Sequence, residues 1–439
     1  MKEQNKIPVS KVERASKFMK AGVKVGGNYI KHYAKKVISG DETDRANLNE
    51  NNAKAIYGSL SELKGSALKV AQMMAMDKNL LPTAYQNQFA MAQYSAPPLS
   101  YPLVVKTFQK YFGKSPVQMF DKFSQSALNA ASIGQVHEAY SNGNRLAVKI
   151  QYPGVAESVS SDLKIAKPLA AKLFGLSNAE VSQYMGEVEE KLLEETDYDL
   201  ELRRSQEITA ACAHIENVIF PNYHPEFSCK RILTMDWMPG AHLKEFLQQN
   251  PSQEVKNKIG QALWDFYDFQ IHSLQQVHAD PHPGNFLMQM NGDLGIIDFG
   301  CVKVIPDKFY QAYFSLLAKD LVKNDEILEK LLFDLEFLFP EDTPDEKRFF
   351  SDIFREMIQL LGKPFHFEEF DFSDSQYFNQ IYDLGERIKN MKEIRKSRTA
   401  RGSRHGLYIN RTYFGLYNLL HDLKAKINTK TLSKLALIA

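Results

Sequence analysis

The chain has few cysteines, no apolar run of membrane-spanning length and almost no net charge. Its three cysteines, Cys212, Cys229 and Cys301, are scattered along the sequence. Their number and spacing exclude a disulfide framework and a four-cysteine zinc site, and they fit a reducing compartment. No apolar run approaches the ~18 residues of a membrane-spanning helix. The N-terminus is charged from Lys2 onward and lacks the texture of a transit peptide, so we expect a cytoplasmic location.

The net charge of +1 hides an uneven distribution of charge along the 439 residues. Residues 1–40 carry +8 and residues 387–439 carry +11, which leaves −18 for residues 41–386. Basic ends favour anionic lipid head groups or nucleic acid as partners. The basic stretch 387–404 has no RNA-binding signature, so we expect no nucleic acid. Peripheral contact with the inner membrane and a solvated or intramolecular face remain the two interpretations.

The first part of the chain is expected to be helical and then to change to strands. Apolar positions at helical spacing predict helices over residues 9–38, 53–77 and 103–128. Near residue 130 the pattern changes, and residues 135–140 and 145–151 have the short alternating pattern of strands. The intervening Ser-Asn-Gly-Asn is a turn signal. We therefore predict a β-hairpin here.

The rest of the chain is expected to be mostly helical. Residues 178–215 predict acidic helices, and residues 232–236 predict a strand that ends at the turn Trp-Met-Pro-Gly. From residue 242 helices dominate, apart from a motif-rich loop at 277–302. The expected domains are a helical extension over 1–125, a small β-rich lobe with a helical insertion over 126–236, and an α-helical lobe over 237–439.

The strongest chemical signal is the block VHADPHPGNFLMQMNGDLGIIDFG at residues 277–300. Asn285 follows Asp280 by five residues, and Asp298 follows thirteen later within Asp-Phe-Gly. Protein kinases place a catalytic Asp, a metal-binding Asn and a second metal-binding Asp at the same offsets. The first Asp must reach the acceptor hydroxyl, while the other two hold Mg²⁺, which prefers oxygen ligands, on the phosphates. The block predicts ATP- and Mg²⁺-dependent phosphoryl transfer.

A zinc site is the rival interpretation of this block, because His278, Asp280 and His282 could all bind a metal. The two histidines are four residues apart, as in helical zinc motifs. Pro281 and Pro283 interrupt any helix, so the rings would not share one helical face. We expect His278 to be a buried imidazole that supports the loop and has no direct chemical role.

A lysine in the hairpin is the second chemical signal. The run RLAVKIQ at 145–151 resembles the V-A-I-K strand of protein kinases, with Lys149 at the lysine position. A lysine in a buried strand needs a charged partner, because unpaired burial is costly. Glu195, Asp197 and Glu201 in a following helix are the candidates, and a plain acidic helix face is the alternative.

The segment before Lys149 takes the place of the glycine-rich loop of protein kinases, G-x-G-x-x-G-x-V. Only Gly134 and Val136 remain, and Asn129 and Ala131 stand at the first two glycine positions. A Cβ atom there limits close backbone approach, so we expect the phosphates to bind differently. The candidate nucleotide-binding residues are Ala130, Ala131, Ser132, Gly134, Val136 and Lys149, with Met235 and Met238 around the turn at the end of strand 232–236.

No Ala-Pro-Glu motif follows Asp298, and the chain continues directly into a predicted helix. Protein kinases present peptide substrates on the segment that ends with that motif. Its absence favours a small-molecule or lipid acceptor, or ATP hydrolysis alone. Small-molecule kinases, which also lack the motif, are the nearest alternative class.

Together these motifs resemble the UbiB/AarF family of atypical kinases, which includes the coenzyme-Q-biosynthesis kinases of bacteria and mitochondria. The resemblance extends over roughly residues 8–302, with a looser match in the C-terminal helices. The segments that carry it are LKGSALKVAQMM (63–74), AASIGQVH (130–137), LAVKIQYPGV (146–155), EETDYDLE (194–201), HADPHPGN (278–285) and IDFG (297–300). It implies an α+β, protein-kinase-like bilobal fold with an N-terminal helical extension and a helix-rich C-lobe.

The resemblance also implies catalytic roles. Lys149 would contact the nucleotide phosphates and pair with Glu201. Asp280 would be the catalytic base, and Asn285 and Asp298 would bind Mg²⁺.

A regulatory motif pair is implied as well. Lys69 and Gln72 match the family's K-x-G-Q motif, and Glu195 and Asp197 match its E-x-D motif. In the family the K-x-G-Q helix lies over the active site and its lysine meets the two acids, which blocks protein substrates. Ala71 replaces the motif glycine and Asn129 the first alanine of the Ala-rich loop, but neither change removes a charged catalytic group.

The expected function is that of a Mg-ATP-dependent atypical kinase or ATPase in prenyl-quinone or other isoprenoid-lipid metabolism. Its expected partners are ATP, a lipid or quinone precursor, and proteins of a biosynthetic complex. The alternative is a nucleotide-gated, non-catalytic module that binds lipids or acts as a scaffold.

Overall fold

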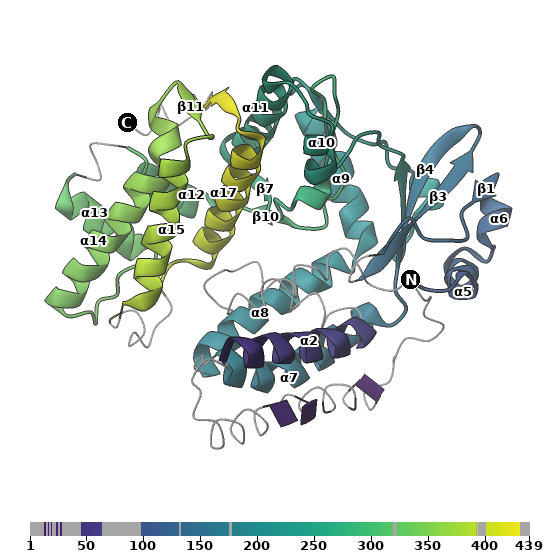
Figure 1. The fold of residues 1–439 in the computed structure, drawn as a ribbon, viewed down its shortest axis with the longest axis horizontal. Coiled ribbons are helices and arrows are strands. Elements are labelled where there is room, and N and C mark those ends of the chain that lie inside the picture. The colour runs from purple at the N-terminus through teal and green to yellow at the C-terminus, as the bar shows by residue number, and fades with distance from the viewer. Residues whose placement is uncertain are drawn as a thin grey trace. The chain divides into compact units, whose positions relative to one another are not determined.

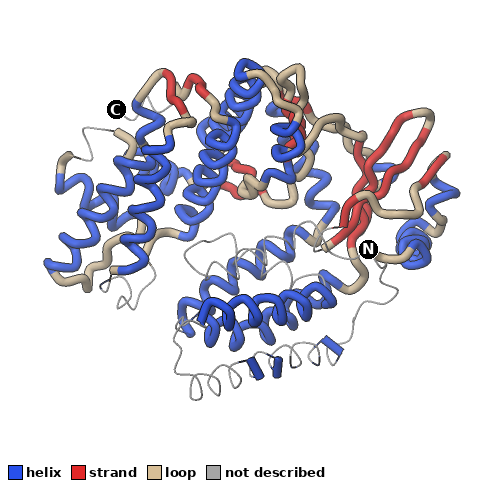
Figure 2. The backbone as a smooth tube through the Cα atoms, in the orientation of Figure 1, coloured by secondary structure: helices blue, strands red, loops and turns tan. Residues whose placement is uncertain are grey.

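The computed structural model describes two units of the chain (Figures 1 and 2). Unit 1 comprises Met1–Arg203 with Asn222–Trp237, and unit 2 comprises Arg204–Pro221 with Met238–Ala439. The described residues are 13–14, 16, 19, 23–24, 27–28, 45–63, 98–130, 133–174, 178–318, 323–391, 393 and 401–430.

Unit 1 combines one antiparallel sheet with helices. Its elements are α2 (Arg45–Leu63), α5 (Tyr101–Phe112), α6 (Pro116–Met119), β1 (Lys122–Phe123), β2 (Asn129–Ala130), β3 (Gly134–Ser141), β4 (Asn144–Gln151), α7 (Val155–Phe174), α8 (Asn178–Glu195), the start of α9 (Tyr198–Cys212), the 3₁₀ turn η2 (Pro225–Phe227) and β6 (Ile232–Asp236).

The sheet has the order β1-β3-β4-β6, and β2 pairs with the start of β3. Strands β3 and β4 form the long hairpin visible in Figure 2, which confirms the predicted hairpin. Asn142 and Gly143 form its turn with φ of 53° and 81°, a conformation that Asn and Gly tolerate. In this register Lys149 lies opposite Val136 on β3 and Leu233 on β6.

One face of the sheet is covered by α5. Val104 and Phe108 of this helix are buried against Leu146, Val148 and Ile150 of the sheet. The predicted helix over 103–128 is wrong in its second half. Helix α5 ends because Gly113, with φ of 70°, donates its N–H to the carbonyl of Gln109, and the chain then forms α6 and β1.

Helix α7 packs against α8 and also binds the N-terminal part of the chain. Arg14, in the N-terminal part of the chain, forms a buried two-pronged ion pair with Asp162 on α7, and its Nε lies 2.7 Å from Oδ1. Fork-shaped Arg–carboxylate pairs fix orientation as well as charge, so this contact ties the N-terminal segment to α7. Most of the predicted helix 9–38, and residues 64–77 of the predicted helix 53–77, lie outside the described residues.

Unit 2 is mainly helical and contains three small sheets. Its helices are the rest of α9, α10 (Leu243–Gln248), α11 (Gln253–Phe269), the π-helical turn η3 (Gln270–Leu274), the 3₁₀ turn η4 (Pro283–Asn285), α12 (Asp307–Ser315), α13 (Asp325–Asp334), α14 (Pro344–Leu361), the 3₁₀ turn η5 (Lys363–His366), α15 (Ser375–Asn390) and α17 (Arg404–Leu423). Its strands are β5 (Val218–Ile219), β7 (Gln276–His278), β8 (Phe286–Met288), β9 (Leu294–Ile296), β10 (Val302–Val304), β11 (Glu369–Asp371) and β12 (Lys426–Asn428).

Helix α11 forms the centre of this unit. Its Trp264 is 2% exposed and packs against the rings of Phe365 and Phe372. Gly260 allows the chain after α17 to approach, because a Cβ atom at this position would lie 2.6 Å from the Cβ of Ala425. The strand pairs β7–β10 and β8–β9 hold the motif-rich loop. No helix among the described residues is long and apolar enough to cross a membrane.

Candidate functional site

In unit 1, Lys149 of β4 is paired with Glu201 of α9. The distance from Lys149 Nζ to Glu201 Oε1 is 2.7 Å, and the two side chains are 18% and 2% exposed. The ring of Tyr198, one turn earlier on α9, lies 5.0 Å from the same ammonium group. Of the three acids that the sequence offered as partners, Glu201 is the one that the structure brings to Lys149.

Glu201 is positioned by the junction between α8 and α9. The carboxylate of Asp197 accepts a hydrogen bond from the backbone N–H of Leu200 at 3.2 Å, which caps the start of α9. The carbonyl oxygen of Thr196 accepts hydrogen bonds from the side chains of Gln151 and Arg231, at 3.0 Å and 2.7 Å. These contacts fix the junction to strand β4 and to the segment before β6.

The E-x-D acids lie on both sides of this junction. Glu195 is the last residue of α8 and is 7% exposed, while Asp197 caps α9. Lys69 and Gln72, the expected partners in the K-x-G-Q motif, lie outside the described residues.

The Ala-rich loop is described at its two ends. Ala130 of β2 pairs with Gln135, and Val136 is half-buried opposite Lys149; Ala131 and Ser132 lie outside the described residues.

Gly134 has a steric role in this part of unit 1. A Cβ atom on Gly134 would lie 2.7 Å from the carbonyl oxygen of Ile150 and 2.9 Å from the hydroxyl oxygen of Tyr198. Glycine is therefore needed for close packing of the loop against β4 and α9.

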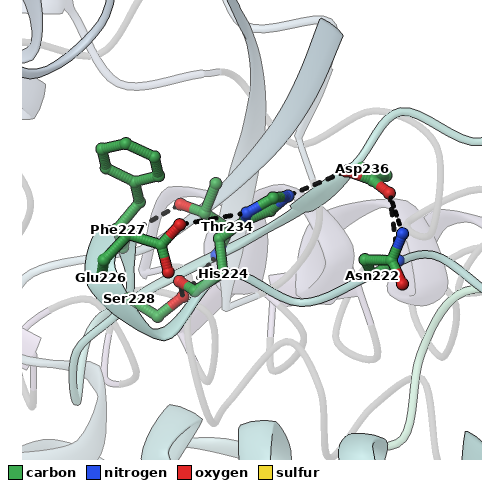
Figure 3. A network of polar contacts seen from close by, with 7 residues as sticks. All are labelled: Asn222, His224, Glu226, Phe227, Ser228, Thr234 and Asp236. Carbon is green, nitrogen blue, oxygen red and sulfur yellow. Dashed lines mark hydrogen bonds and ion pairs between the residues drawn. The ribbon is translucent and has the colours of Figure 1, made fainter. Parts of the chain in front are cut away.

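A polar network fixes the end of β6 (Figure 3). His224 Nε2 lies 2.8 Å from Asp236 Oδ1, and the amide of Asn222 donates to Asp236 Oδ2 at 2.7 Å. Burial raises the pKa of Asp236, but the hydrogen bonds from His224 and Asn222 outweigh it and hold the pKa below its usual value. Met235, next to Asp236, is 7% exposed and lies opposite Ala147.

In unit 2, His278 connects helix α11 to the Asp-Phe-Gly segment. Its Nε2 lies 2.5 Å from the carbonyl oxygen of Asp298, and its Nδ1 lies 3.2 Å from the hydroxyl of Tyr267. Since a carbonyl can only accept, Nε2 carries the proton and Nδ1 accepts from the phenol. Burial, reinforced by the charge of Asp280, raises the pKa of Tyr267 well above its usual range, so this donor stays protonated. His278 is buried, as predicted, and it supports the loop.

Asp280 and Asn285 are linked through the backbone. The side-chain amide nitrogen of Asn285 donates to the carbonyl oxygen of Asp280 at 2.9 Å, so the amide oxygen is the atom directed elsewhere. The N–H of His282 also donates to this carbonyl, at 2.7 Å. The carboxylate of Asp280 lies 3.9 Å from the guanidinium of Arg411 on α17.

Asp298 follows β9, and its Oδ1 accepts the N–H of Gly300 at 2.9 Å. Met238 approaches the same strand, because its methyl carbon would lie 3.0 Å from a Cβ atom on Gly295.

The predicted metal residues offer the donor atoms that Mg²⁺ prefers. Asp298 contributes a carboxylate and Asn285 an amide oxygen, and Mg²⁺ commonly uses one or two protein oxygens together with phosphate. Both side chains are held by backbone hydrogen bonds, so they fit such an ion. Within the described part of the chain, no three His, Cys, Asp or Glu side chains form a group suited to a metal ion. Both ring nitrogens of His278 are engaged by protein groups, which argues against the zinc interpretation.

Sequence reasoning did not identify three residues that complete these arrangements. Tyr198 lies inside the EETDYDLE segment and could have been noticed as an aromatic residue one turn before Glu201. Arg411 and Gln270 carry no local signal. The side-chain oxygen of Gln270 accepts the N–H of His278 at 2.9 Å, from within the π-helical turn η3. Such turns are frequent at functional sites.

These features define a kinase-like protein, and comparison with known proteins agrees. The ABC1 atypical kinase-like domain model matches residues 91–331, which is more than half of the chain. The chain belongs to this family of atypical kinases. The predicted family and the predicted kinase-like α+β fold are thereby confirmed.

Individual relatives extend over most of the chain. The probable serine/threonine-protein kinase abkA of Dictyostelium discoideum is 25% identical over 97% of this chain and 79% of its own length. The mitochondrial atypical kinase COQ8 of Saccharomyces cerevisiae is 27% identical over 86% of this chain and 76% of its own length. Rv3197 of Mycobacterium tuberculosis, solved in complex with erythromycin, has a TM-score of 0.60 at 26% identity and covers 89% of this chain and 98% of its own.

Proposed function

We propose that the chain is a Mg-ATP-dependent atypical kinase or ATPase. The observation that carries this proposal is the 2.7 Å pair between Lys149 and the buried Glu201. Protein kinases need such a lysine–glutamate pair for phosphoryl transfer, since it holds the lysine ready for the nucleotide phosphates. Its presence is more than a fold alone requires, because burying an ion pair is costly.

The catalytic loop is proposed to act as follows. Asp280 orients the acceptor hydroxyl or water and accepts its proton, within hydrogen-bond reach. Asn285 and Asp298 hold Mg²⁺, and the backbone contacts of both side chains support this role. Bound Mg²⁺ supplies neutralisation of the negative charge on the phosphates.

The nucleotide is proposed to contact Lys149, the Ala-rich loop and the end of β6. The loop residues are Ala130, Ala131, Ser132, Gly134 and Val136. Met235 and Met238 are proposed to lie near the adenine ring of the nucleotide. Met235 is buried and lies opposite Ala147 of β4, so it would border the nucleotide site from within the sheet.

The acceptor is proposed to be a lipid or quinone precursor, in prenyl-quinone or isoprenoid-lipid metabolism. The relative COQ8 is a mitochondrial atypical kinase by name, and the missing Ala-Pro-Glu motif disfavours a peptide acceptor. The basic ends are proposed to contact anionic lipid at the membrane surface. Lys69, Gln72, Glu195 and Asp197 are proposed to restrict access to the site. The boundaries at residues 125 and 236 remain our proposed domain limits.

The test is ATP turnover by the purified full chain with Mg²⁺, measured with and without anionic liposomes and a phenolic quinone-precursor mimic. We expect turnover that rises with lipid and is lost in Asp298→Asn and Asp280→Asn. The matched control is Asp334→Asn, an exposed aspartate on α13, which should behave as wild type.

Two other outcomes would change the conclusion. No turnover, but stabilisation of the fold on heating with ATP, would make the chain a non-catalytic nucleotide-binding module. Neither turnover nor stabilisation would reject nucleotide binding altogether.

A further inference from the structure

Helix α17 contacts the catalytic loop of unit 2 along one face. The ammonium nitrogen of Lys303 on β10 lies 5.0 Å from the centroid of the Tyr408 ring. Arg411 lies 3.9 Å from the carboxylate of Asp280. Gly415 faces the next loop residue, Pro281. Positions three and four residues apart share one face of a helix, so these three contacts form a single stripe along α17.

The contact at Gly415 is too close for any other residue without rearrangement. A Cβ atom there would lie 2.2 Å from Cγ and 2.8 Å from Cβ of Pro281. A proline ring cannot move out of the way as the end of a flexible side chain can. Glycine inside a helix is unfavourable compared with alanine, so its position in the middle of α17 needs a packing reason. The approach of the helix backbone to the loop supplies that reason.

The other face of α17 is packed differently. Asn410, Tyr413, Phe414 and Tyr417 line an apolar cavity together with residues of α12 and α14. The hydroxyl of Tyr413 lies 3.4 Å from Nε2 of His272, and Thr412 is fully buried. This packing holds the backbone of α17 in place. The side chains that face the loop therefore project from a fixed helix backbone.

We propose that Arg411 is a positioning residue for Asp280, and that α17 is a structural part of the catalytic loop. This inference rests on the function proposed above. Helix α17 begins at Arg404, beyond residues 91–331 that the family model matches. The backbone carbonyl of Asp280 is held by Asn285 and His282, whereas its carboxylate faces Arg411. The guanidinium lies beyond hydrogen-bond distance, so its positive charge attracts the carboxylate and restricts its position.

The test compares matched variants on the same helix. Arg411→Gln is compared with Arg404→Gln, an exposed arginine of α17, and Gly415→Ala with Gly406→Ala, where the nearest atom would be 3.8 Å from the new Cβ. We expect Arg411→Gln and Gly415→Ala to lower kcat for ATP turnover by ~10²-fold, the typical cost of a displaced catalytic group, with an unchanged KM for ATP. Arg411→Lys, which keeps the charge, should retain more of kcat than Arg411→Gln.

A second measurement does not depend on turnover. Hydrogen exchange, followed by mass spectrometry without nucleotide, should be faster in residues 279–286 of Arg411→Gln and Gly415→Ala than in the two controls. If wild type shows no turnover but this difference is present, the proposed function fails and the positioning role stands. If Arg411→Gln matches Arg404→Gln in both kcat and exchange, the inference is overturned. A split between kcat and KM, with thermal unfolding unchanged, distinguishes positioning from a loss of folding.

Discussion

The two units present their chemical groups in different ways. In unit 1 the groups come from regular elements, Lys149 from the middle of a strand and Glu201 from a helix. In unit 2 they come from loop residues, Asp280, Asn285 and Asp298, that flank short strands. A strand register determines where a side chain points, whereas a loop needs added contacts. In unit 2 these contacts come from His278, Gln270 and Arg411.

The ion pairs of the two units differ in separation and in burial. The Lys149–Glu201 pair is in direct contact at 2.7 Å and its acid is almost fully buried. The Arg411–Asp280 pair is separated by 3.9 Å, and its members are 28% and 18% exposed. Removing one member of a buried contact pair leaves the other charge buried without its counter-charge and destabilises the fold, while a looser pair leaves its acid accessible for chemistry. The predictions below test this contrast, beginning with the largest effect.

The largest effect is expected at the buried pair of unit 1. Lys149→Met should lower the free energy of unfolding by ~3 kcal/mol or more, because Glu201 loses the ammonium group that faces it in a buried position. Urea unfolding measures the change. Glu207→Gln, an exposed acid of the same helix, should stay within ~0.5 kcal/mol of wild type. Equal effects of the two variants would show that the pair does not support the fold.

A slightly smaller effect is expected at Gly134. Gly134→Ala should destabilise unit 1 by ~1–3 kcal/mol, because the new Cβ atom meets the backbone oxygen of Ile150 at 2.7 Å. The control is Gly186→Ala on α8, where no atom lies within 4 Å and where alanine favours the helix by up to ~1 kcal/mol. Chemical denaturation should thus show opposite signs for the two substitutions. The same sign would contradict the close-packing argument.

In unit 2 the comparable test is a substitution of the buried His278. His278→Phe keeps a ring but leaves the carbonyl of Asp298 and the hydroxyl of Tyr267 without this partner. We expect a loss of ~1–3 kcal/mol in the free energy of unfolding, the usual cost of an unsatisfied buried group. Thermal or urea unfolding of this variant measures it. An unchanged stability would mean that the loop is held by its backbone contacts alone.

Over a single pH unit, the smallest effect is the pH dependence of the stability of unit 2. Burial lowers the pKa of His272 to about 3, and its ring lies against the hydroxyls of Tyr310 and Tyr413. Below pH ~6.5 the unfolded chain binds a proton at this residue that the folded chain does not. The contribution of His272 to the free energy of unfolding is therefore fully present above pH ~6.5 and is lost as the pH falls toward about 3.

The expected slope for this histidine is ~1.4 kcal/mol per pH unit. Urea unfolding at pH 7.0, 6.0 and 5.0 measures the slope, and His272→Gln should reduce it. If the variant keeps the full slope, another group is responsible for the acid sensitivity.

Local chemistry explains which parts of the structure could be predicted. The hairpin followed from an Asn-Gly turn between two alternating runs, which needs no distant contact. The strand 232–236 was predicted at its observed bounds, because the turn signal Trp-Met-Pro-Gly that ends it is also local. The helix predicted over 103–128 was too long, because apolar spacing continues past Gly113 while the αL conformation of this glycine ends the helix.

Some residues of the candidate site could be predicted from local spacing, and others could not. Asp280, Asn285 and Asp298 lie within one short segment, so their spacing alone suggested a catalytic loop. Choosing Glu201 from three nearby acids by residue chemistry alone was not possible, because the choice depends on how α9 packs on β4.

The sequence by itself determined the β3–β4 hairpin, the strand 232–236, the position of the catalytic motifs and the family, since these depend on residue type and short spacing. Only the tertiary structure showed the further side chains that contact these motifs. Tyr198 supports Lys149, Gln270 holds His278, and Arg411 faces Asp280 from a helix far along the chain. Such contacts arise when separate elements are buried against each other, and packing between distant segments leaves no periodic signal in the residues that take part.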